Sequence, residues 1–300
     1  MKIACVFGGA GFLGSHVADK LSDAGYKVRV FDIRYSKWIR SDQEMVIGDL
    51  LNLAEVEEAV RGSEVVYNFA ALASLREGLK NPIDTIRINI LGNAHVMEAC
   101  RCHGVKRFIY ASTVYVYSRD GGFYRCSKQS AEHYVEEYQR MYGLDYTILR
   151  YGSLYGPRAD ISNGIYRLVK LALETGLIEY QGSPESLREY IHVEDAALAS
   201  VAALGFDFRN QSVVLTGQES MRVLDMLEIL AEILGIQGAV KFREGEHAGH
   251  YVRTPYAYQP KVGRKYIPPM HVDFGQGLLQ LIEEIRSSVD YDKEKSRLDS

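Results

Sequence analysis

Tyr124 and Lys128 are the two side chains whose types and spacing first suggest catalysis. If their segment is helical, residues four apart lie on one face and both side chains reach the same point. A tyrosine with a pKa of about 10 is a poor base at neutral pH, but a neighbouring ammonium lowers that pKa and allows proton transfer. Because the chain has 21 tyrosines, this spacing also arises by chance, and alone it is equally compatible with an exposed helix surface.

A hydroxyl that could orient a substrate oxygen is supplied by Thr113. This residue follows the apolar segment 107–111, which is predicted to be a strand. Open parallel sheets bind their ligands beyond the carboxyl ends of the strands. We therefore expect Thr113 to hold the substrate oxygen and share its proton.

A glycine-rich segment, Gly8-Gly9-Ala10-Gly11-Phe12-Leu13-Gly14, separates the first predicted strand from the first predicted helix. Glycines here allow a tight turn, let the backbone approach a pyrophosphate and let the helix pack on the strand. The helix N-terminus offers unpaired N–H groups and partial positive charge to phosphates. A GxxGxxG triplet alone fits any tight strand–helix turn, but its place in a β-α-β unit favours a dinucleotide.

Asp32 closes the second predicted strand, 18 residues after Gly14. An acid at this point accepts hydrogen bonds from the adenosine ribose and repels a 2′-phosphate, so we expect NAD rather than NADP. Arg34 is the one residue that favours NADP, and it follows the acid instead of replacing it. The alternative for Asp32 is a simple turn residue after a strand.

The elements that must position these residues alternate along the first half of the chain. Continuous apolar strands separated by helices indicate a parallel sheet covered on both faces, and right-handed crossovers make it doubly wound. We therefore predict an α/β fold with a Rossmann-type doubly wound parallel sheet. Strands are expected at 2–7, 27–32, 64–68, 107–111 and 146–150, and helices at 12–24, 53–61, 83–103, 125–142, 193–204, 222–234 and 276–287.

Glycine and proline punctuate the second half of the chain, which indicates a smaller second lobe. We predict a dinucleotide-binding domain at 1–152 and a mainly substrate-binding lobe at 153–290. A strand within 185–216, such as 212–215, is expected to return to the main sheet. The charged segment 291–300 is predicted to be a disordered tail.

Composition excludes several classes of protein. With 47% hydrophobic and 25% charged residues, the chain has the composition of an ordinary soluble globular protein. A net charge of −4 without a basic stripe gives no reason to expect nucleic acid or a membrane as partner. The four cysteines lack the spacing of a zinc or redox pair and the eight histidines are scattered, so no metal is expected. The first residues are too short an apolar run for a signal peptide, and the default location is cytoplasmic.

Taken jointly, these motifs resemble an extended short-chain dehydrogenase/reductase, in the NAD-dependent epimerase/dehydratase group that acts on nucleotide sugars. The resemblance covers roughly the first 200 residues and is specific because the motifs occur in order. They are GGAGFLG at 8–14, Asp32, GDL at 48–50, NFAA at 68–71, Asn89 in INILGN, ASTVYVY at 111–117, YRCSK at 124–128, LRYGSLYGPR at 149–158 and REYIHVEDAA at 188–197.

The resemblance implies roles for individual residues. Tyr124 is similar to the catalytic tyrosine, Lys128 to the lysine that binds the nicotinamide ribose, and Thr113 to the serine or threonine of the same set. Cofactor contacts are then expected at Gly8, Gly11, Phe12, Leu13, Gly14, Asp32, Arg34, Asp49, Leu50, Phe69, Ala70, Ala71, Asn89, Lys128 and Tyr151. Among these, Asp49 and Leu50 resemble adenine contacts, Asn89 resembles a support of the active-site backbone, and Tyr151 resembles a residue beside the nicotinamide. Substrate contacts are expected at Thr113, Tyr124, Ser153 and Arg188, with Arg188 on the nucleotide phosphates. The family also implies a homodimer through helices 83–103 and 125–142.

Three departures from the family pattern affect these roles. Asn68 stands where the family usually has histidine, and Ser153 stands where asparagine is common. The segment 118–123 is much shorter than the loop expected there, which should leave the sugar pocket more open.

The leading hypothesis from the resemblance is 4-epimerisation of a nucleotide-diphosphate sugar through a transient 4-keto sugar. The same residues would serve a net 4-dehydrogenase or 4-ketoreductase. A 4,6-dehydratase is disfavoured because Val114 and Tyr115 occupy the two positions after Thr113 where such enzymes have an acidic pair. A non-catalytic NAD-sensing scaffold is the alternative from another class, although such proteins generally lose the tyrosine or the lysine.

Overall fold

A doubly wound parallel sheet forms the centre of the protein, as predicted. The computed structural model describes residues 2–243 and 264–298. Its eight-stranded sheet has parallel pairings throughout. The strands lie in the order β14 (Arg264–Lys265), β11 (Gln211–Leu215), β6 (Tyr146–Tyr151), β5 (Arg107–Thr113), β4 (Val65–Asn68), β1 (Ile3–Phe7), β2 (Lys27–Asp32) and β3 (Gln43–Ile47).

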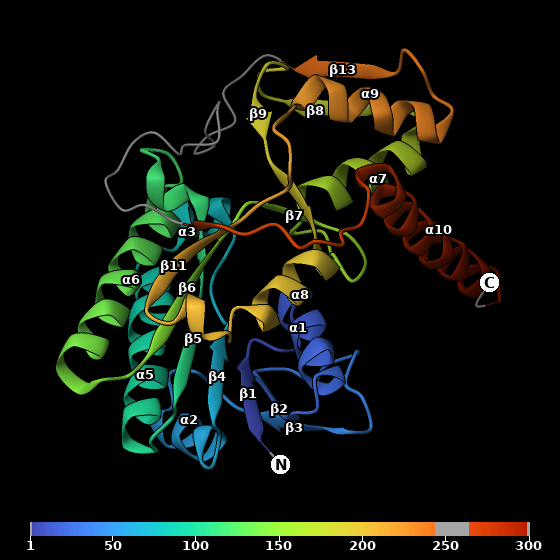
Figure 1. Ribbon diagram of the computed structural model, residues 1–300. Coiled ribbons are helices and arrows are strands. Elements are labelled where there is room, and N and C mark those ends of the chain that lie inside the picture. Colours follow the sequence, from blue (N-terminus) through green and yellow to red (C-terminus); the bar gives the residue numbers. More distant parts are fainter. Residues whose placement is uncertain (1, 244–263, 299–300) are drawn as a thin grey trace.

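Helices cover both faces of this sheet (Figure 1). One face carries α1 (Phe12–Asp23) and α8 (Val193–Ala202), and the other carries α2 (Leu53–Val60), α5 (Asn93–Cys102) and α6 (Gly122–Tyr142). Side chains of β1 alternate between the two layers: Ala4 and Val6 pack on the α1 side, whereas Cys5 and Phe7 pack on the α2 side. Both faces of the central strands are therefore apolar, which explains their continuous hydrophobic sequence.

The direction of winding reverses between β1 and β4, which lie side by side in the sheet. The turns that leave these two strands meet there, because a Cβ on Gly8 would lie 2.5 Å from the backbone nitrogen of Ala70. In open α/β sheets this switch point is where a crevice for ligands forms.

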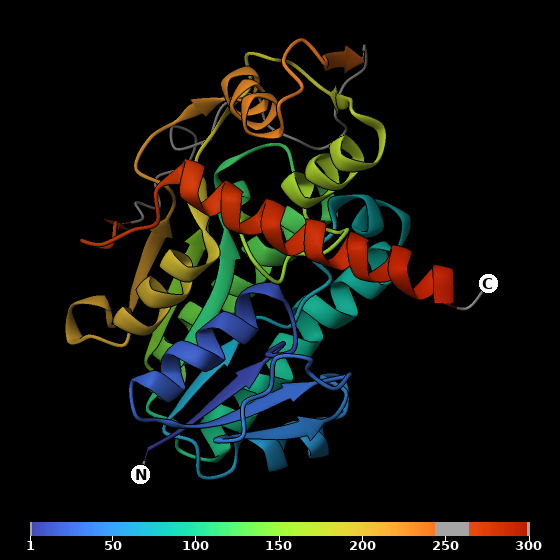
Figure 2. The same cartoon turned by 90° about the vertical axis from the view of Figure 1, so that its right-hand side faces the viewer.

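The second lobe lies above the carboxyl edge of the sheet in Figure 1. Its core is formed by α7 (Gly164–Thr175), α9 (Val223–Leu234) and α10 (Phe274–Leu298), together with the paired strands β8 (Ile178–Gln181) and β13 (Val240–Arg243). The structure has two further two-stranded pairs, β7 (Ser153–Tyr155) with β10 (Tyr190–His192) and β9 (Leu187–Arg188) with β12 (Met221–Arg222). Figure 2 shows α10 as one long helix that runs across the molecule. Within the described residues, every helix is too short or too polar to span a bilayer.

The structure refines several expected elements. The helix expected at 83–103 consists of α4 (Pro82–Ile86), the π-helical segment η1 (Arg87–Gly92) and α5. Strand β3 and helices α3 (Leu75–Lys80) and α7 were not expected from the sequence. Helix α10 continues to Leu298, through most of the charged segment for which a disordered tail was predicted.

Candidate active site

Thr113 and Tyr124 are brought together at the carboxyl edge of the sheet. Thr113 ends β5, and its hydroxyl accepts a hydrogen bond of 3.3 Å from the backbone N–H of Tyr115 in the short 3₁₀ helix η2 (Val114–Tyr117). Tyr124 lies in the first turn of α6. Burial raises the pKa of Tyr124 to about 12, and a side-chain hydrogen bond with Thr113 opposes this rise. The two hydroxyls therefore form the expected pair.

Lys128 lies one turn further along α6 and is buried. Its ammonium donates a 2.7 Å hydrogen bond to the carbonyl oxygen of Ala111, and lies 4.8 Å from the ring centroid of Tyr110 and 5.9 Å from that of Tyr124. Burial lowers the pKa of Lys128 to about 7, and the charge of Glu132 opposes this. Because burial disfavours both phenolate and ammonium, their charged forms depend on the charges that surround them.

Asn89 ties the loop after β4 to the helix that carries the tyrosine. Its side-chain oxygen accepts from the N–H of Leu72 at 2.7 Å, and its amide donates to the Leu72 carbonyl at 3.0 Å and to the Ser127 hydroxyl at 2.9 Å. Ser127 in turn donates to the carbonyl of Tyr124 at 2.7 Å. Asn89 belongs to η1, and such π-helical turns are frequent at functional sites. This geometry supports the role predicted for Asn89.

The glycine-rich turn is packed too closely to accept side chains at Gly9 and Gly14. A Cβ on Gly14 would lie 2.3 Å from the carbonyl oxygen of Gly8, and one on Gly9 would lie 2.8 Å from the side chain of Val30. Gly8 also has a φ of +74°, which favours glycine. The N-cap residue of α1, Gly11, has no side chain to cap the helix, and no acidic residue lies in its first turn. The N–H groups of Phe12 and Leu13 therefore begin an uncapped helix facing this turn, and these residues fit a dinucleotide.

Asp32 fixes the glycine-rich turn through backbone hydrogen bonds, and its contact with the ribose stays a prediction. Its carboxylate accepts hydrogen bonds from the N–H of Ala10 at 3.1 Å and from the N–H of Arg34 at 3.4 Å. The hydrogen bond with Ala10 connects the end of β2 to the turn after β1. The Arg34 side chain is exposed beside this acid, and its contact with the cofactor stays a prediction.

The two residues predicted to contact adenine lie between β3 and α2. Asp49 accepts from the N–H of Leu51 at 2.9 Å, and its own N–H donates to Glu55 at 2.7 Å. Leu50 is buried in the core and packs so closely on Gly92 that a Cβ there would lie 2.5 Å from it. Leu50 therefore has a packing role, and its contact with adenine stays a prediction.

The segment after β4 forms the other wall of the crevice. The ring of Phe69 packs against Tyr67, with centroids 6.0 Å apart, and the N–H of Ala70 donates to the side chain of Asn68 at 3.1 Å. Ala71 is partly buried beside them. Asn68 replaces the usual histidine and donates to Asn93 at 2.8 Å, so the substitution is accommodated by a buried amide pair.

Tyr151 lies beside Thr113 in the sheet register, but its side chain points into the core. Its hydroxyl is 2.7 Å from that of Ser200 in α8, and its ring packs against Phe69, with centroids 6.5 Å apart. The structure thus gives Tyr151 a packing role next to the site, and its expected contact with the nicotinamide stays a prediction.

A cavity of about 600 Å³ extends from the catalytic hydroxyls into the second lobe. Thr113, Tyr115 and Tyr124 line it at the sheet, and Ser153 and Arg188 line it toward the lobe. Arg188 is nearly buried and donates to the carbonyl of Leu187 at 3.0 Å. The cavity therefore joins all four predicted substrate contacts.

Sequence reasoning missed the part of this cavity that comes from α7 and β8. Asn163, Arg167 and Tyr180 line it there. Asn163 caps α7 by accepting from the N–H of Tyr166 at 3.1 Å. An asparagine followed by apolar residues at helical spacing is the signal that could have located this helix.

The missing loop before the tyrosine is replaced by a tight turn. Gly121 and Gly122 have φ values of +95° and +51°, and a Cβ on Gly121 would lie 2.8 Å from the ring of Tyr115. Arg125 donates to the carbonyl of Ser118 at 2.9 Å and closes the turn. Two glycines thus let a short segment deliver Tyr124 to Thr113 while Tyr115 lines the cavity.

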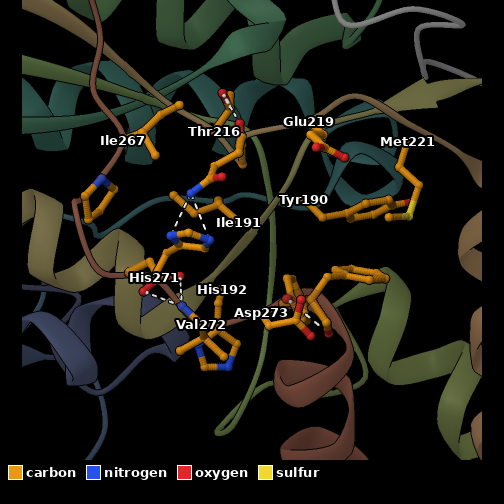
Figure 3. Close-up of a pocket in the computed structure, with 16 residues that line it drawn as sticks. Tyr190, Ile191, His192, Thr216, Glu219, Met221, Ile267, His271, Val272 and Asp273 are labelled. Carbon is orange, nitrogen blue, oxygen red and sulfur yellow. Dashed lines mark hydrogen bonds between the residues drawn. The ribbon is translucent and has the colours of Figure 1, made fainter.

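A second cavity, of about 220 Å³, shares Tyr190 with the first and lies beside α10 (Figure 3). Gln218 and His271 are hydrogen-bonded across it, with the amide nitrogen 2.6 Å from Nδ1 of the ring. Asp195 accepts from the N–H of Val272 at 2.9 Å, so this acid holds the chain before α10. The four predicted substrate contacts line the larger cavity and not this one.

His192 lies at the wall of the smaller cavity and is only 2% exposed. Among the described residues, neither ring nitrogen has a hydrogen-bond partner. The ring is enclosed, because a Cβ on Gly156 would lie 2.7 Å from Nε2 and one on Gly277 would lie 2.8 Å from Cδ2. Burial lowers the pKa of His192 to about 4. His192 is therefore a packed neutral histidine at the junction with α10.

Comparison with known proteins gives a consistent result. The sequence profile of the NAD dependent epimerase/dehydratase family matches residues 4–215. A putative UDP-glucose 4-epimerase of Methanocaldococcus jannaschii is 29% identical over 268 residues, which cover 80% of this chain and 86% of that protein. The UDP-glucose 4-epimerase of Thermotoga maritima, solved with UDP-glucose, is 26% identical with a TM-score of 0.82 over 96% of this chain and 100% of that one. The UDP-glucose 4-epimerase of Thermus thermophilus, solved with NAD, is 26% identical with a TM-score of 0.79 over 95% and 99%. The chain belongs to the NAD-dependent epimerase/dehydratase family of sugar-nucleotide enzymes.

Proposed function

We propose that this protein is an NAD-dependent 4-epimerase of a UDP-sugar. The observation that carries the proposal is the single cavity that has the Thr113 and Tyr124 hydroxyls at one end and Arg188 at the other. This arrangement suits a substrate with a hydroxyl to be oxidised at one end and a diphosphate at the other. The names of the relatives at 26–29% identity support the choice of UDP and of position 4.

Each residue then has one task. When bound, NAD supplies an acceptor and donor of hydride. Tyr124 takes the proton from the C4 hydroxyl while Thr113 holds that oxygen, and a charged Lys128 favours the phenolate. Arg188 holds the nucleotide end, so that the 4-keto sugar turns in the open end of the cavity and receives hydride on its other face.

The distribution of charge in the cavity favours epimerisation over elimination of water. Among the described residues that line it, the only carboxylate is Glu179 of β8, which belongs to the lobe and not to the catalytic end. Val114 is buried away from the cavity, and Tyr115 contributes a ring. A 4,6-dehydratase needs an acid beside the sugar, and Thr113 has none next to it in sequence.

The test is to incubate the purified protein with a panel of UDP-, dTDP- and GDP-sugars. We expect a UDP-sugar to reach an equilibrium mixture of C4 epimers by proton NMR, without net absorbance of NADH at 340 nm. The Tyr124→Phe variant is the control and should form no epimer. Stoichiometric NADH with a released 4-keto sugar would show a net dehydrogenase instead.

We also propose that the protein is a homodimer through α4, η1 and α6. These elements expose a set of large apolar side chains, which isolated proteins rarely leave in water. The set is Ile83, Ile86, Leu91, Tyr134, Met141 and Tyr142. Light scattering should give twice the mass of the chain, and Ile86→Glu should shift it toward the monomer. Monomeric unaltered protein at micromolar concentration would refute the interface.

A further inference from the structure

A buried ion pair joins α6, the helix that carries Tyr124 and Lys128, to β6 of the sheet. Arg150 of β6 donates to Glu132 of α6 through Nε at 3.0 Å and through Nη2 at 2.7 Å. The two side chains are only 1% and 4% exposed. Two charges buried at this depth carry a large desolvation penalty, and apolar residues of similar volume generally serve stability as well. The pair therefore calls for a role beyond packing.

The ion pair also binds the strand that carries Thr113. The hydroxyl of Ser112 donates to Glu132 Oε1 at 2.5 Å, and Arg150 Nη1 donates to the hydroxyl of Tyr117 at 2.6 Å. Ser112 precedes Thr113 and follows Ala111, whose carbonyl accepts the Lys128 hydrogen bond. Glu132 thus connects α6, β5 and β6 at the point where the catalytic side chains meet.

Glu132 continues the stripe of Tyr124 and Lys128 at the same four-residue spacing, so all three face the sheet. The titratable groups around the Lys128 ammonium are Tyr110 on β5, and Tyr124 and Glu132 on α6 itself; β6 contributes Arg150, which is bonded to Glu132. Of these, Glu132 is the carboxylate whose charge favours the Lys128 ammonium. Its removal takes away the charge that favours the ammonium.

We propose that Glu132 is a positioning residue of the catalytic set, acting through Ser112 on the strand that bears Thr113 and through its charge on the Lys128 ammonium. This inference rests on the proposed roles of Tyr124 and Lys128. An opposite charge at close range favours the protonated amine. Neutralising Glu132 should therefore make Lys128 lose its proton at lower pH.

The test is calorimetric titration with NAD from pH 6 to pH 9, combined with the pH profile of sugar turnover. In the unaltered protein, we expect NAD affinity and kcat to fall as Lys128 loses its proton. In Glu132→Gln, both falls should begin about one pH unit lower. Lys128→Met should remove this pH dependence of NAD affinity, which assigns it to that side chain.

Glu136→Gln is the matched control, because it removes the same charge from α6 one turn further from Lys128. It should keep the unaltered pH profile. If Glu132→Gln does not fold, the double variant Glu132→Gln with Arg150→Gln replaces it, because it leaves no unpaired charge in the core. The same shift of the pH profile is expected.

The proposal is overturned if Glu132→Gln lowers NAD affinity and kcat by the same factor at every pH. It is also overturned if NAD affinity and kcat of the unaltered protein do not fall with rising pH. A shifted NAD profile in a protein that turns over none of the sugars would refute the proposed reaction and still support the role of Glu132. Epimerisation by a protein whose pH profile is not shifted by Glu132→Gln would support the proposed reaction and refute the role of Glu132.

Discussion

Replacing His192 with phenylalanine should make the protein markedly less sensitive to acid. The ring is enclosed by Gly156 and Gly277, and neither nitrogen has a partner among the described residues. Burial lowers the pKa from 6.5 to about 4, so the folded protein resists protonation that the unfolded chain accepts. The free energy of unfolding that is lost through His192 is therefore zero above pH 6.5, grows as the pH falls toward 4, and stays constant below that value.

The size of the effect follows from the two pKa values. A difference of about 2.5 pH units corresponds to about 3 kcal/mol in full, of which about 2 kcal/mol is lost at pH 5. Urea unfolding at pH 8 and pH 5 measures it. Between pH 8 and pH 5, the free energy of unfolding of the unaltered protein should fall by about 2 kcal/mol more than that of His192→Phe. Any packing cost of the larger ring is the same at both pH values and cancels in the comparison.

His133→Gln provides the control, because it removes an imidazole that is exposed rather than buried. Parallel pH dependences for the unaltered protein and His192→Phe would refute the reasoning. That result would mean that the buried ring finds a proton acceptor or opens to water.

Three further predictions concern the cofactor crevice. Gly14→Ala should lower the free energy of unfolding by about 1–3 kcal/mol and weaken NAD binding in calorimetry, because its Cβ meets the Gly8 carbonyl. The control is Gly164→Ala, which should be neutral because its Cβ meets only the end of a side chain at 4.0 Å. Equal stability of the two variants would contradict this. Asn89→Ala should cost about 1–3 kcal/mol in thermal unfolding and lower kcat, since it removes the partner of the Leu72 N–H and carbonyl and the link to Ser127, and an unaltered melting temperature would refute it. Asp32→Ala should weaken NAD binding and reduce the preference for NAD over NADP, and an undiminished preference would show that Arg34 or another group sets it.

The sequence was sufficient for the sheet because its central strands are buried on both faces and therefore read as continuous apolar segments. It failed for β3, whose residues Gln43–Ile47 are only partly buried and show no such pattern. The π-helical turn at 87–92 could not be seen either, because it depends on how Asn89 reaches Leu72 across the fold. Helix α10 keeps apolar residues at helical spacing, Leu278, Leu281, Ile282 and Ile285, before its charged end, and the charges concealed its length.

The site was predictable where contacts are local in sequence. The spacing of Tyr124 and Lys128 predicted that one helix carries both, which is α6, and the glycine-rich turn predicted the start of α1. Contacts that join distant segments were not predictable, because only the fold brings together Ser112, Glu132 and Arg150. The same holds for Tyr180, which reaches the cavity from a strand that pairs with β13 in the second lobe.

The return of β11 to the sheet affects how the protein can be made and divided. Its residues Gln211–Leu215 pair with β6, yet they are synthesised only after α7 and β8 of the second lobe. A fragment ending at residue 152 would leave β6 as a bare apolar edge and invite aggregation. On the ribosome, β6 likewise lacks its outer neighbour in the sheet until the segment with α7 and β8 has been synthesised.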